Sequence, residues 1–395
     1  MILKNVRLIP YLTEDFEQEY ADIVIRENKI EAILPAGSIQ SDEILDAKGK
    51  TLLPGLMDLH MHLYFSDGNF AALGAKSQNE QFVDSIAYAR QYLDDGYTLI
   101  RDCGNTHQIG VAIRDAIARG LIDGPRVITS GKCITPTAKG NDTFPNLYLE
   151  VDDPERMLEV CRKEYVTGVD FLKYMATGSV ANVTGEPGAL VTTKEELFAI
   201  QKAAETLGTY VAVHCHGTSG IRLCIEAGIR TIEHASFMTQ ECIEMILERG
   251  NQSSLIPTLT PVCEMYEDVE NSVPQYLKEK VASIFDAAHM LVNAERAGVK
   301  LGWGTDCSMK FSGHHTGYEF YARKKVGFTE QEILQQATIN SAKILGLDED
   351  FGTVKVGKYA DLILVDGKPD EEISVMYQKP LLVIKGGEVK RNRMK

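Results

Sequence analysis

The feature that most constrains the fold is a regular alternation of short apolar runs with longer amphipathic segments. Eight runs rich in β-branched and other apolar residues recur within the 395-residue chain. They are TLLPGLMDLHMH (51–62), YTLIRDCGN (97–105), RVITSG (126–131), DFLKYMATG (170–178), YVAVHCHG (210–217), TIEHAS (231–236), SSLIPTLT (253–260) and KLGWGTDC (300–307). Strand alternating with helix indicates parallel βαβ units. Eight such units over residues 54–350 favour an α/β fold with a closed (β/α)8 TIM barrel.

Several segments between the runs have readable helix boundaries. Thr193 and Thr329 each precede a glutamate by three residues, which is the capping-box pattern at a helix start. We expect Asp84 to open a further helix, which Gly96 can end. No GxGxxG motif follows an early strand, which disfavours a dinucleotide-binding fold.

The two ends of the chain lack the alternation of strand-like and helical segments that is found in its middle. Residues 1–53 and 351–395 contain short strands and turns, such as DIVIRENKIEAILP and ADLILVDGK. Neither end can bury much apolar surface alone. We therefore expect a composite β-sandwich made of 1–53 plus 351–395, beside a metal-dependent barrel domain over 54–350.

Composition restricts the class of protein. A hydrophobic fraction of 44% and a charged fraction of 25% are typical of a soluble enzyme. No apolar run reaches 18 residues and no secretory pattern opens the sequence, so we expect a cytoplasmic protein without a membrane partner. The eight cysteines form no CxxC pair, which favours free thiols over disulfides. The net charge of −15 disfavours nucleic acid as a partner.

Metal-binding side chains gather at the ends of the strand-like runs. His60 and His62 are two positions apart, so both point to one face of their strand. His214, His234 and Asp306 each follow an apolar stretch in a later run. The carboxyl ends of barrel strands meet at one face, where such folds place their active sites. Imidazole and carboxylate suit zinc and similar ions, so we expect these five residues to bind metal.

Lys173 stands at the end of another run, in DFLKYMATG. A lysine there would usually reach solvent or pair with an acid. Facing two cations, its ammonium would be repelled. A carbamate formed with carbon dioxide would instead offer two oxygens that can bridge two ions.

With these residues in place, the chain resembles the amidohydrolase superfamily in its binuclear form with a carboxylated lysine. The resemblance covers nearly the whole chain. The stretches GLMDLHMHL, FLKYMATGSV, VAVHCHG, TIEHASFM and GWGTDC are similar to one branch of it. That branch contains zinc dipeptidases and carboxypeptidases that cleave Xaa-Pro or Xaa-Arg/Lys, among them zinc-dependent arginine carboxypeptidases, and relatives acting on N-acyl amino acids.

The resemblance implies the role of each residue. His60 and His62 would hold the more buried of two divalent ions, zinc by preference, and His214 and His234 the more exposed one. The carbamate of Lys173 would bridge the ions, and Asp306 would bind the buried ion and act as the catalytic proton carrier. A hydroxide bridging the ions would then hydrolyse an amide or peptide bond of a small-molecule substrate. Relatives tend to form homo-oligomers, which is the expected assembly here.

Three further residues are candidates for substrate contacts. His216 follows His214 by two positions and can polarise the scissile carbonyl or support a ligand. Lys139 stands where relatives of this branch often carry a histidine, so it either binds a substrate carboxylate or is a solvated loop lysine. Glu264 follows the seventh run and can pair with a substrate guanidinium, or belong to a solvated loop face. His314 and His315, with the GEPG turn at 185–188, are candidates for a lid.

Three functions remain open at this point. The leading one is release of a C-terminal amino acid, with arginine or lysine favoured over proline. The second is an aminohydrolase, either a deaminase or an imidazolonepropionase-like ring opener. Deaminases of this fold place an acid shortly after the fifth-strand histidine, whereas HCHGTSGIR has none. The third is a non-catalytic scaffold, which a complete ligand set disfavours.

Overall fold

The computed structural model describes residues 1–40, 44–66, 74–180, 188–267, 273–307 and 316–394. The chain divides into two compact units. The terminal unit comprises Met1–Asp58, Ala89–Leu99 and His315–Lys395. The central unit comprises Leu59–Tyr88 and Ile100–His314.

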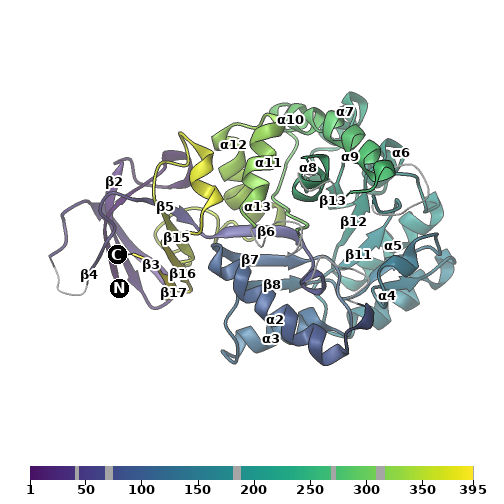
Figure 1. Ribbon diagram of the computed structural model, residues 1–395, viewed down its shortest axis with the longest axis horizontal. Coiled ribbons are helices and arrows are strands. Elements are labelled where there is room, and N and C mark those ends of the chain that lie inside the picture. The colour runs from purple at the N-terminus through teal and green to yellow at the C-terminus, as the bar shows by residue number, and fades with distance from the viewer. Residues whose placement is uncertain (41–43, 67–73, 181–187, 268–272, 308–315, 395) are drawn as a thin grey trace. The chain divides into compact units, whose positions relative to one another are not determined.

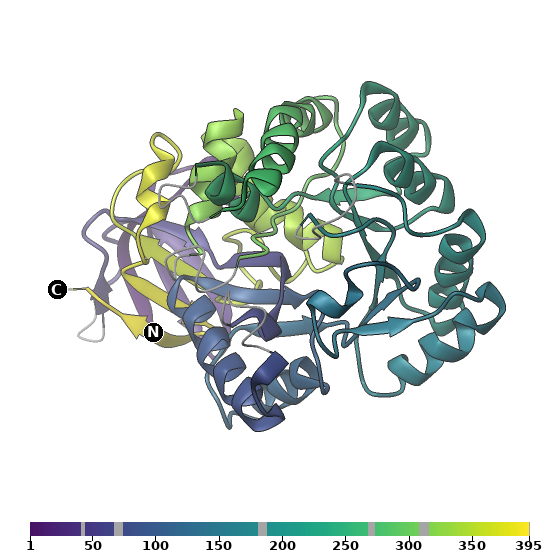
Figure 2. The ribbon, with the colours of Figure 1, turned by 45° about the vertical axis from the view of Figure 1, so that its right-hand side comes forward.

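The terminal unit contains one mixed eight-stranded sheet built from both ends of the chain. Its strands are β1 (Ile2–Arg7), β2 (Tyr20–Arg26), β3 (Lys29–Pro35), β4 (Ile44–Asp46), β5 (Thr51–Pro54), β15 (Leu362–Val365), β16 (Leu382–Lys385) and β17 (Glu388–Asn392). Their order is β17-β16-β15-β5-β1-β2-β3, with β4 paired to β1. Strands from the beginning (purple) and the end (yellow) of the chain lie together in this sheet in both views (Figure 1, Figure 2). The sheet joins both ends of the chain through antiparallel pairing of β5 with β15.

One apolar cluster packs the N-terminal and C-terminal parts of the chain together in this sheet. It takes buried side chains from β1, β2, β5, β15 and β16, including Leu3, Ile23, Leu52 and Leu362. Arg7 adds a bidentate ion pair, with its two terminal nitrogens 2.7 and 2.8 Å from the carboxylate of Asp370. The two ends are therefore held by both apolar burial and a directional contact.

Parallel strands form the framework of the central unit. The first sheet contains β6 (Leu56–Met61), β7 (Tyr97–Asp102) and β8 (Arg126–Thr129), and the first two of these strands begin in the terminal unit. The second has the order β10-β9-β11-β12-β13-β14 and parallel pairing throughout. Its strands are β9 (Cys133–Thr135), β10 (Tyr148–Glu150), β11 (Leu172–Met175), β12 (Val211–Cys215), β13 (Thr231–His234) and β14 (Ser254–Ile256).

The described strands do not form the single closed sheet that the sequence predicts. The run at 300–307 makes isolated bridges at Leu301 and Gly304 instead of a regular strand. Backbone hydrogen bonds nevertheless link this run to both sheets: Leu255 N donates to Lys300 O at 2.9 Å, and Leu59 N to Trp303 O at 2.8 Å. A Cβ at Gly304 would lie 2.8 Å from the Cβ of His60, so the chain passes too closely there for any larger residue.

Helices connect these strands along the chain. They are α2 (Gln78–Asp94), α3 (Ile109–Ala118), α4 (Met157–Tyr165), α5 (Lys194–Leu207), α6 (Thr218–Ala227), α7 (Gln240–Glu248), α8 (Thr260–Glu267), α9 (Gln275–Ala287), α10 (His289–Arg296), α11 (Tyr318–Val326), α12 (Glu330–Gln335) and α13 (Ser341–Leu345). In the central unit, α5 and α6 pack on β12, on the outer side of the sheet in Figure 1 and in the turned view of Figure 2.

The predicted helix boundaries are confirmed in two cases and wrong in one. Thr193 and Thr329 both make complete capping boxes. Asp84 does not begin a helix, because α2 already starts at Gln78. The true start signal is Ser77, whose hydroxyl accepts from Glu80 N at 3.3 Å while the Glu80 carboxylate accepts from Ser77 N at 2.8 Å. This pair satisfies the first amides of α2 and leaves Asp84 in its interior.

Two expectations from composition can be compared with the structure. All eight cysteines are buried and free, which confirms the prediction of free thiols. Among the described helices, none combines the length and apolar character that crossing a membrane requires.

Candidate metal centre

The central unit contains a cavity of about 310 Å³, and residues at the carboxyl ends of the strands of this unit line it. All six predicted metal ligands line this cavity: His60, His62, Lys173, His214, His234 and Asp306. Their side chains come from β6, β11, β12, β13 and the run at 300–307, which are far apart in sequence. The parallel strands explain this convergence, since their carboxyl ends lie at one edge.

His60 and His62 present matching nitrogen atoms to Asp306. Nδ1 of His60 lies 2.7 Å from Glu233 Oε2, and Nδ1 of His62 lies 2.9 Å from Gly104 O. These acceptors favour a proton on Nδ1 and leave the Nε2 lone pair for a metal. The two Nε2 atoms lie 3.9 and 3.6 Å from Asp306 Oδ1. Ligands of tetrahedral zinc are separated by about 3.3 Å, so a small contraction would bring these three onto one ion.

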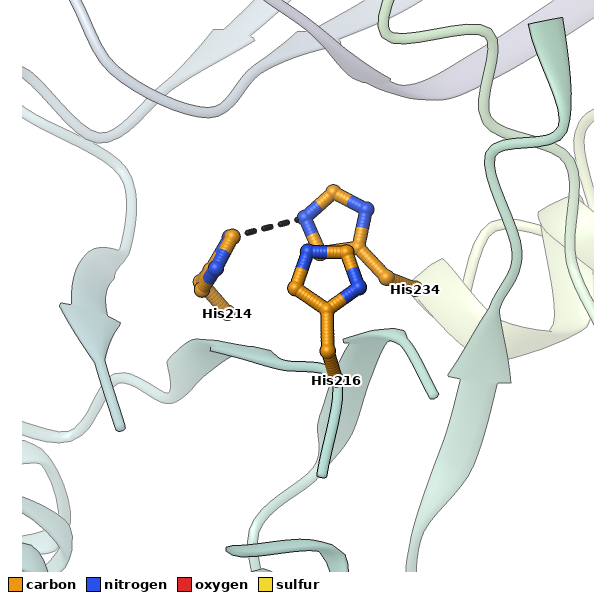
Figure 3. A group of neighbouring side chains, drawn as sticks. All are labelled: His214, His216 and His234. Carbon is orange, nitrogen blue, oxygen red and sulfur yellow. Dashed lines mark hydrogen bonds between the residues drawn. The ribbon is translucent and has the colours of Figure 1, made fainter. Parts of the chain in front are cut away.

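His214 and His234 form a second pair. Nδ1 of His214 and Nε2 of His234 are 2.9 Å apart and face each other, as Figure 3 shows. The remaining nitrogen of His234 lies 2.7 Å from Thr258 Oγ1, which fixes the orientation of the ring. The ring of His216 stacks on that of His234 at a centroid distance of 4.5 Å. These three imidazoles can together hold one ion, and His60, His234 and Asp306 form an overlapping group of the same kind.

Two candidate ligands adopt backbone conformations that are uncommon for residues other than glycine. His234 has φ of 67° and Asp306 has φ of 46°. Ala235 N donates to Glu233 O at 2.8 Å, so His234 is the central residue of a three-residue turn. Such conformations cost about 1–3 kcal/mol each and concentrate at functional sites. Both side chains line the cavity, His234 at the end of β13 and Asp306 near the end of the run at 300–307.

The imidazoles of the cavity are held in the neutral form, which is the form that binds metals. Burial, and after it the charge of the Lys173 ammonium, lower the pKa of His62 to about 3. The same two causes lower the pKa of His216 to about 3. Burial also lowers the pKa values of His60, His214 and His234 well below the usual range.

Lys173 is the unusual member of this group. Its side chain is buried at 1% exposure, and Nζ has no hydrogen-bond partner within the described part of the chain. An isolated buried ammonium is expensive, because burial removes its hydration without replacement. Paired strands place Lys173 beside Ala212 and Cys133, neither of which can neutralise it. A carbamate bound to two cations would remove this conflict, so the donor set fits the predicted metal pair.

A buried ion pair supports His60 from the side away from the cavity, and sequence reasoning missed it. Arg101 Nη2 donates to both oxygens of Glu233 at 2.7 and 2.9 Å, and both side chains are fully buried. Arg101 Nε also donates to Leu59 O at 2.5 Å. Burial is the largest single effect on Arg101 and opposes its charge, but the Glu233 carboxylate together with Cys103 and Tyr210 raises the guanidinium pKa. The signal was a charged residue inside each of two apolar runs, YTLIRDC and TIEH.

A second buried carboxylate, Asp102, supports the chain beside His62. It accepts from Thr129 Oγ1 at 2.9 Å, from Asn105 Nδ2 at 2.6 Å and from Leu63 N at 3.1 Å. Burial raises its pKa to about 6 in spite of these donors. Asp102 thus fixes the segment that follows His62.

Two of the three predicted substrate contacts line the cavity, and the third does not. His216 and Glu264 line the cavity, and Nδ1 of His216 lies 2.8 Å from Ser236 Oγ. Lys139 is exposed and is not among the residues that line the cavity. His314, His315 and residues 185–187 lie outside the described part of the chain.

The Arg101–Glu233 pair generates a prediction about metal affinity. Glu233→Gln should weaken zinc binding by about 10–100-fold, because His60 loses its carboxylate partner. It should also lower the free energy of unfolding by about 3–5 kcal/mol, because Arg101 is left buried and unpaired. The double variant Arg101→Met/Glu233→Gln removes that cation and should recover stability without recovering zinc affinity. Competition with a chelator and chemical denaturation measure the two quantities.

A matched control exists in the terminal unit, where Glu319 and Arg323 form another fully buried pair at 2.7 Å. Glu319→Gln should destabilise the protein and leave zinc affinity unchanged. Wild-type zinc affinity in a folded Arg101→Met/Glu233→Gln protein would contradict a positioning role for Glu233.

Comparison with known proteins agrees with this geometry. A solved Xaa-Pro dipeptidase with methionine bound in its active site is 30% identical, with 99% of both chains covered and a TM-score of 0.86. A prolidase complexed with N-methylphosphonate-L-proline is 26% identical, with a TM-score of 0.87 over 99% of both chains. Ochratoxinase of Aspergillus niger is 28% identical over 372 residues, which are 86% of this chain and 75% of that protein. These similarities are consistent with the dipeptidase branch, and residues 51–390 match the profile of the amidohydrolase family. The chain therefore belongs to the amidohydrolase family of hydrolytic enzymes, as the resemblance in its sequence implied.

Proposed function

We propose that this amidohydrolase uses two zinc ions to hydrolyse an amide or peptide bond, releasing a C-terminal amino acid from dipeptides or N-acyl amino acids. The observation that carries the proposal is the convergence of His60, His62, His214, His234, Asp306 and Lys173 on one cavity. A scaffold without catalysis would have no need for six converging donors. A homo-oligomeric assembly and a cytoplasmic location stay predictions of the sequence.

Two finer features of the fold belong to the same proposal. The two parallel sheets and the run at 300–307 would together make the (β/α)8 barrel over 54–350, since backbone hydrogen bonds join that run to both sheets. The branched terminal sheet would make the composite β-sandwich of 1–53 plus 351–395. One apolar cluster supports this, because it receives side chains from both ends of the chain.

Two groups of ligands are proposed within the cavity. His60, His62 and Asp306 would hold one ion, supported by the spacing of their facing atoms at 3.6 and 3.9 Å. His214 and His234 would hold the other. Lys173, as a carbamate, would bridge both, which gives its buried Nζ a role. His216 stays a candidate contact to the substrate carbonyl, although it lies close enough to His214 and His234 to compete as a ligand.

The bound ions would lower the pKa of a water molecule to near neutrality and polarise the scissile carbonyl. A residue of the chain would perform the proton transfers. Asp306 would take the proton from the attacking water and deliver it to the leaving amine. Its position next to both Nε2 atoms and at the cavity surface, with its side chain 22% exposed, lets it contact substrate as well as metal. Buried carboxylates such as Glu233 lack that access.

The released residue is proposed to be arginine or lysine. Glu264, on α8, lines the cavity and would pair with a guanidinium, a strong contact when partly desolvated. Lys139 remains a weaker candidate for the substrate carboxylate, because its side chain is exposed outside the lining set.

Two alternatives use the same site. An Xaa-Pro dipeptidase is favoured by the two related proline-specific structures, and would leave Glu264 without a role in specificity. An imidazolonepropionase-like or deaminating aminohydrolase would leave Lys173 without a role as a metal ligand. Turnover of Xaa-Arg, Xaa-Pro and a cyclic amidine or aminopurine in parallel separates the three.

The first prediction concerns metal stoichiometry. The wild-type enzyme should contain two zinc ions per chain, and Lys173→Ala should lose most metal and activity, because the bridging ligand is gone. A short-chain carboxylic acid such as propionate should restore part of both. Lys194→Ala, at a lysine whose side chain is 58% exposed, is the matched control. Fully active enzyme with one ion per chain would contradict the proposal; elemental analysis decides.

The second prediction concerns Asp306. Asp306→Asn keeps the size of the side chain and much of its metal affinity but cannot accept a proton. Turnover should fall by about 10²–10⁴-fold at unchanged metal content. A metal-loaded variant that retains more than about a third of wild-type turnover would show that another group carries the proton.

The third prediction concerns specificity. Glu264→Gln should weaken transition-state stabilisation for Xaa-Arg by about 1.5–3 kcal/mol, the value of a hydrogen bond to a charged group, and spare Xaa-Leu and Xaa-Met. Glu267→Gln is the control, since Glu267 is on the same helix but not among the lining residues. Faster wild-type turnover of Xaa-Pro than of Xaa-Arg would favour the prolidase alternative.

A further inference from the structure

One part of the cavity lining is apolar and largely aromatic. We name it the aromatic wall. It consists of Phe65, Phe144, Leu147, Tyr148 and Met175, which line the cavity and belong to one apolar cluster. The most buried of them, Leu147, is 2% exposed, and Met175, the most exposed of the four buried members, is 9% exposed. The wall is therefore a packed surface rather than a set of mobile side chains.

The rings of this wall continue outward from a candidate metal ligand. The ring of Phe65 lies 4.5 Å from that of His62, measured between centroids, at an interplanar angle of 37°. Phe144 follows at 5.4 Å from Phe65, and Tyr148 at 6.3 Å from Phe144 with its plane turned by 78°. These separations are those of favourable aromatic pairs. A group attached to a carbonyl at the ion site would therefore meet aromatic surface next to His62.

Strand register independently places this wall beside the reacting centre. Tyr148 on β10 is paired with Cys133 on β9, and Cys133 is paired with Lys173 on β11. Residues paired across parallel strands point to the same face of the sheet. Tyr148 and Lys173 thus face the same cavity from strands two positions apart.

A second apolar group lines the cavity and differs from the aromatic wall in charge. It is formed by Val180, Val262, Met265 and Leu277, with the carboxylate of Glu264 among them. The aromatic wall has no charged side chain. Burial keeps its neighbour Cys133 protonated by raising the thiol pKa to about 12, and burial also raises the pKa of the Tyr148 hydroxyl. The cavity is therefore asymmetric, with an apolar aromatic side and an apolar side that contains an acid.

We infer that the acyl half of the substrate carries an aromatic ring, which packs on the aromatic wall while the released amino acid lies on the Glu264 side. This inference rests on the proposed amide hydrolysis and adds the identity of the half that the hydrolysis leaves behind. A substrate ring extends the row that begins at His62, and it gains both burial and an oriented ring contact. A charged acyl group would lose its hydration on this side without a partner among the described lining residues. At about 310 Å³ the cavity is at the small end of ligand sites, which suits one ring and one amino acid.

The experiment compares acyl groups on a common amino acid. N-phenylacetyl and N-acetyl derivatives of both arginine and leucine are assayed with zinc-loaded enzyme, and kcat/KM is measured for each. The phenylacetyl compounds should be hydrolysed about 10–200-fold more efficiently for either amino acid, the range for apolar groups in a fitted pocket. Phe144→Leu and Leu147→Ala, with zinc content verified, should each reduce this ratio by about tenfold. Phe198→Leu, on α5 at 38% exposure, is the control that should keep it.

The outcomes separate this inference from the function on which it rests. Equal efficiency for the two acyl groups, or a ratio that both wall variants leave unchanged, would overturn the aromatic acyl half while amide hydrolysis stands. Hydrolysis of none of the four compounds would refute the proposed function and the inference with it. A preserved acyl ratio with no preference for arginine over leucine would support the wall and contradict only the role of Glu264.

Discussion

The rest of the site depends on the burial of a lysine among histidines. Lys173 lies at 1% exposure, and the five imidazoles that line the same cavity are held neutral by burial and by its charge. An ammonium in such a place is unfavourable, and five neutral rings with inward nitrogen atoms are poor partners for it. The conflict would disappear if the amine became a carbamate and cations occupied the space between the donors. The electrostatics of the site therefore favour the proposed pair of ions.

Three of the candidate histidines, His60, His62 and His234, are fixed through the nitrogen that does not face the ion site. Glu233, Gly104 and Thr258 perform this function for His60, His62 and His234 at 2.7–2.9 Å. Glu233 in turn is held by Arg101, so one chain of contacts runs from β7 through β13 to β6. Since these contacts orient the rings, we expect them to contribute to metal affinity. Unusual backbone conformations at His234 and Asp306 complete the arrangement.

The sequence predicts which side chains line the cavity better than it predicts what surrounds them. His60, His62, His214, His234 and Asp306 were identifiable because parallel strands bring their carboxyl ends together, and position at a strand end is readable in sequence. Arg101 and Glu233 were missed because pairing between two distant strands leaves only a weak trace, a charge inside an apolar run. The start of α2 was misplaced because an interior aspartate resembled a cap, whereas Ser77 and Glu80 form the capping box. The run at 300–307 was expected to be a strand but makes isolated bridges, and the close approach of the chain at Gly304 is a tertiary contact that no local pattern reports.

The central claim is that two ions and a modified lysine share this cavity, and anomalous diffraction from crystals of the zinc-loaded protein tests it most directly. Data collected on both sides of the zinc absorption edge locate each ion without assumptions about ligands. We expect two peaks, one next to His60, His62 and Asp306 and the other next to His214 and His234, with electron density extending from Lys173 Nζ towards both. A single peak coordinated by His214, His216 and His234, with an unmodified Lys173, would contradict the account.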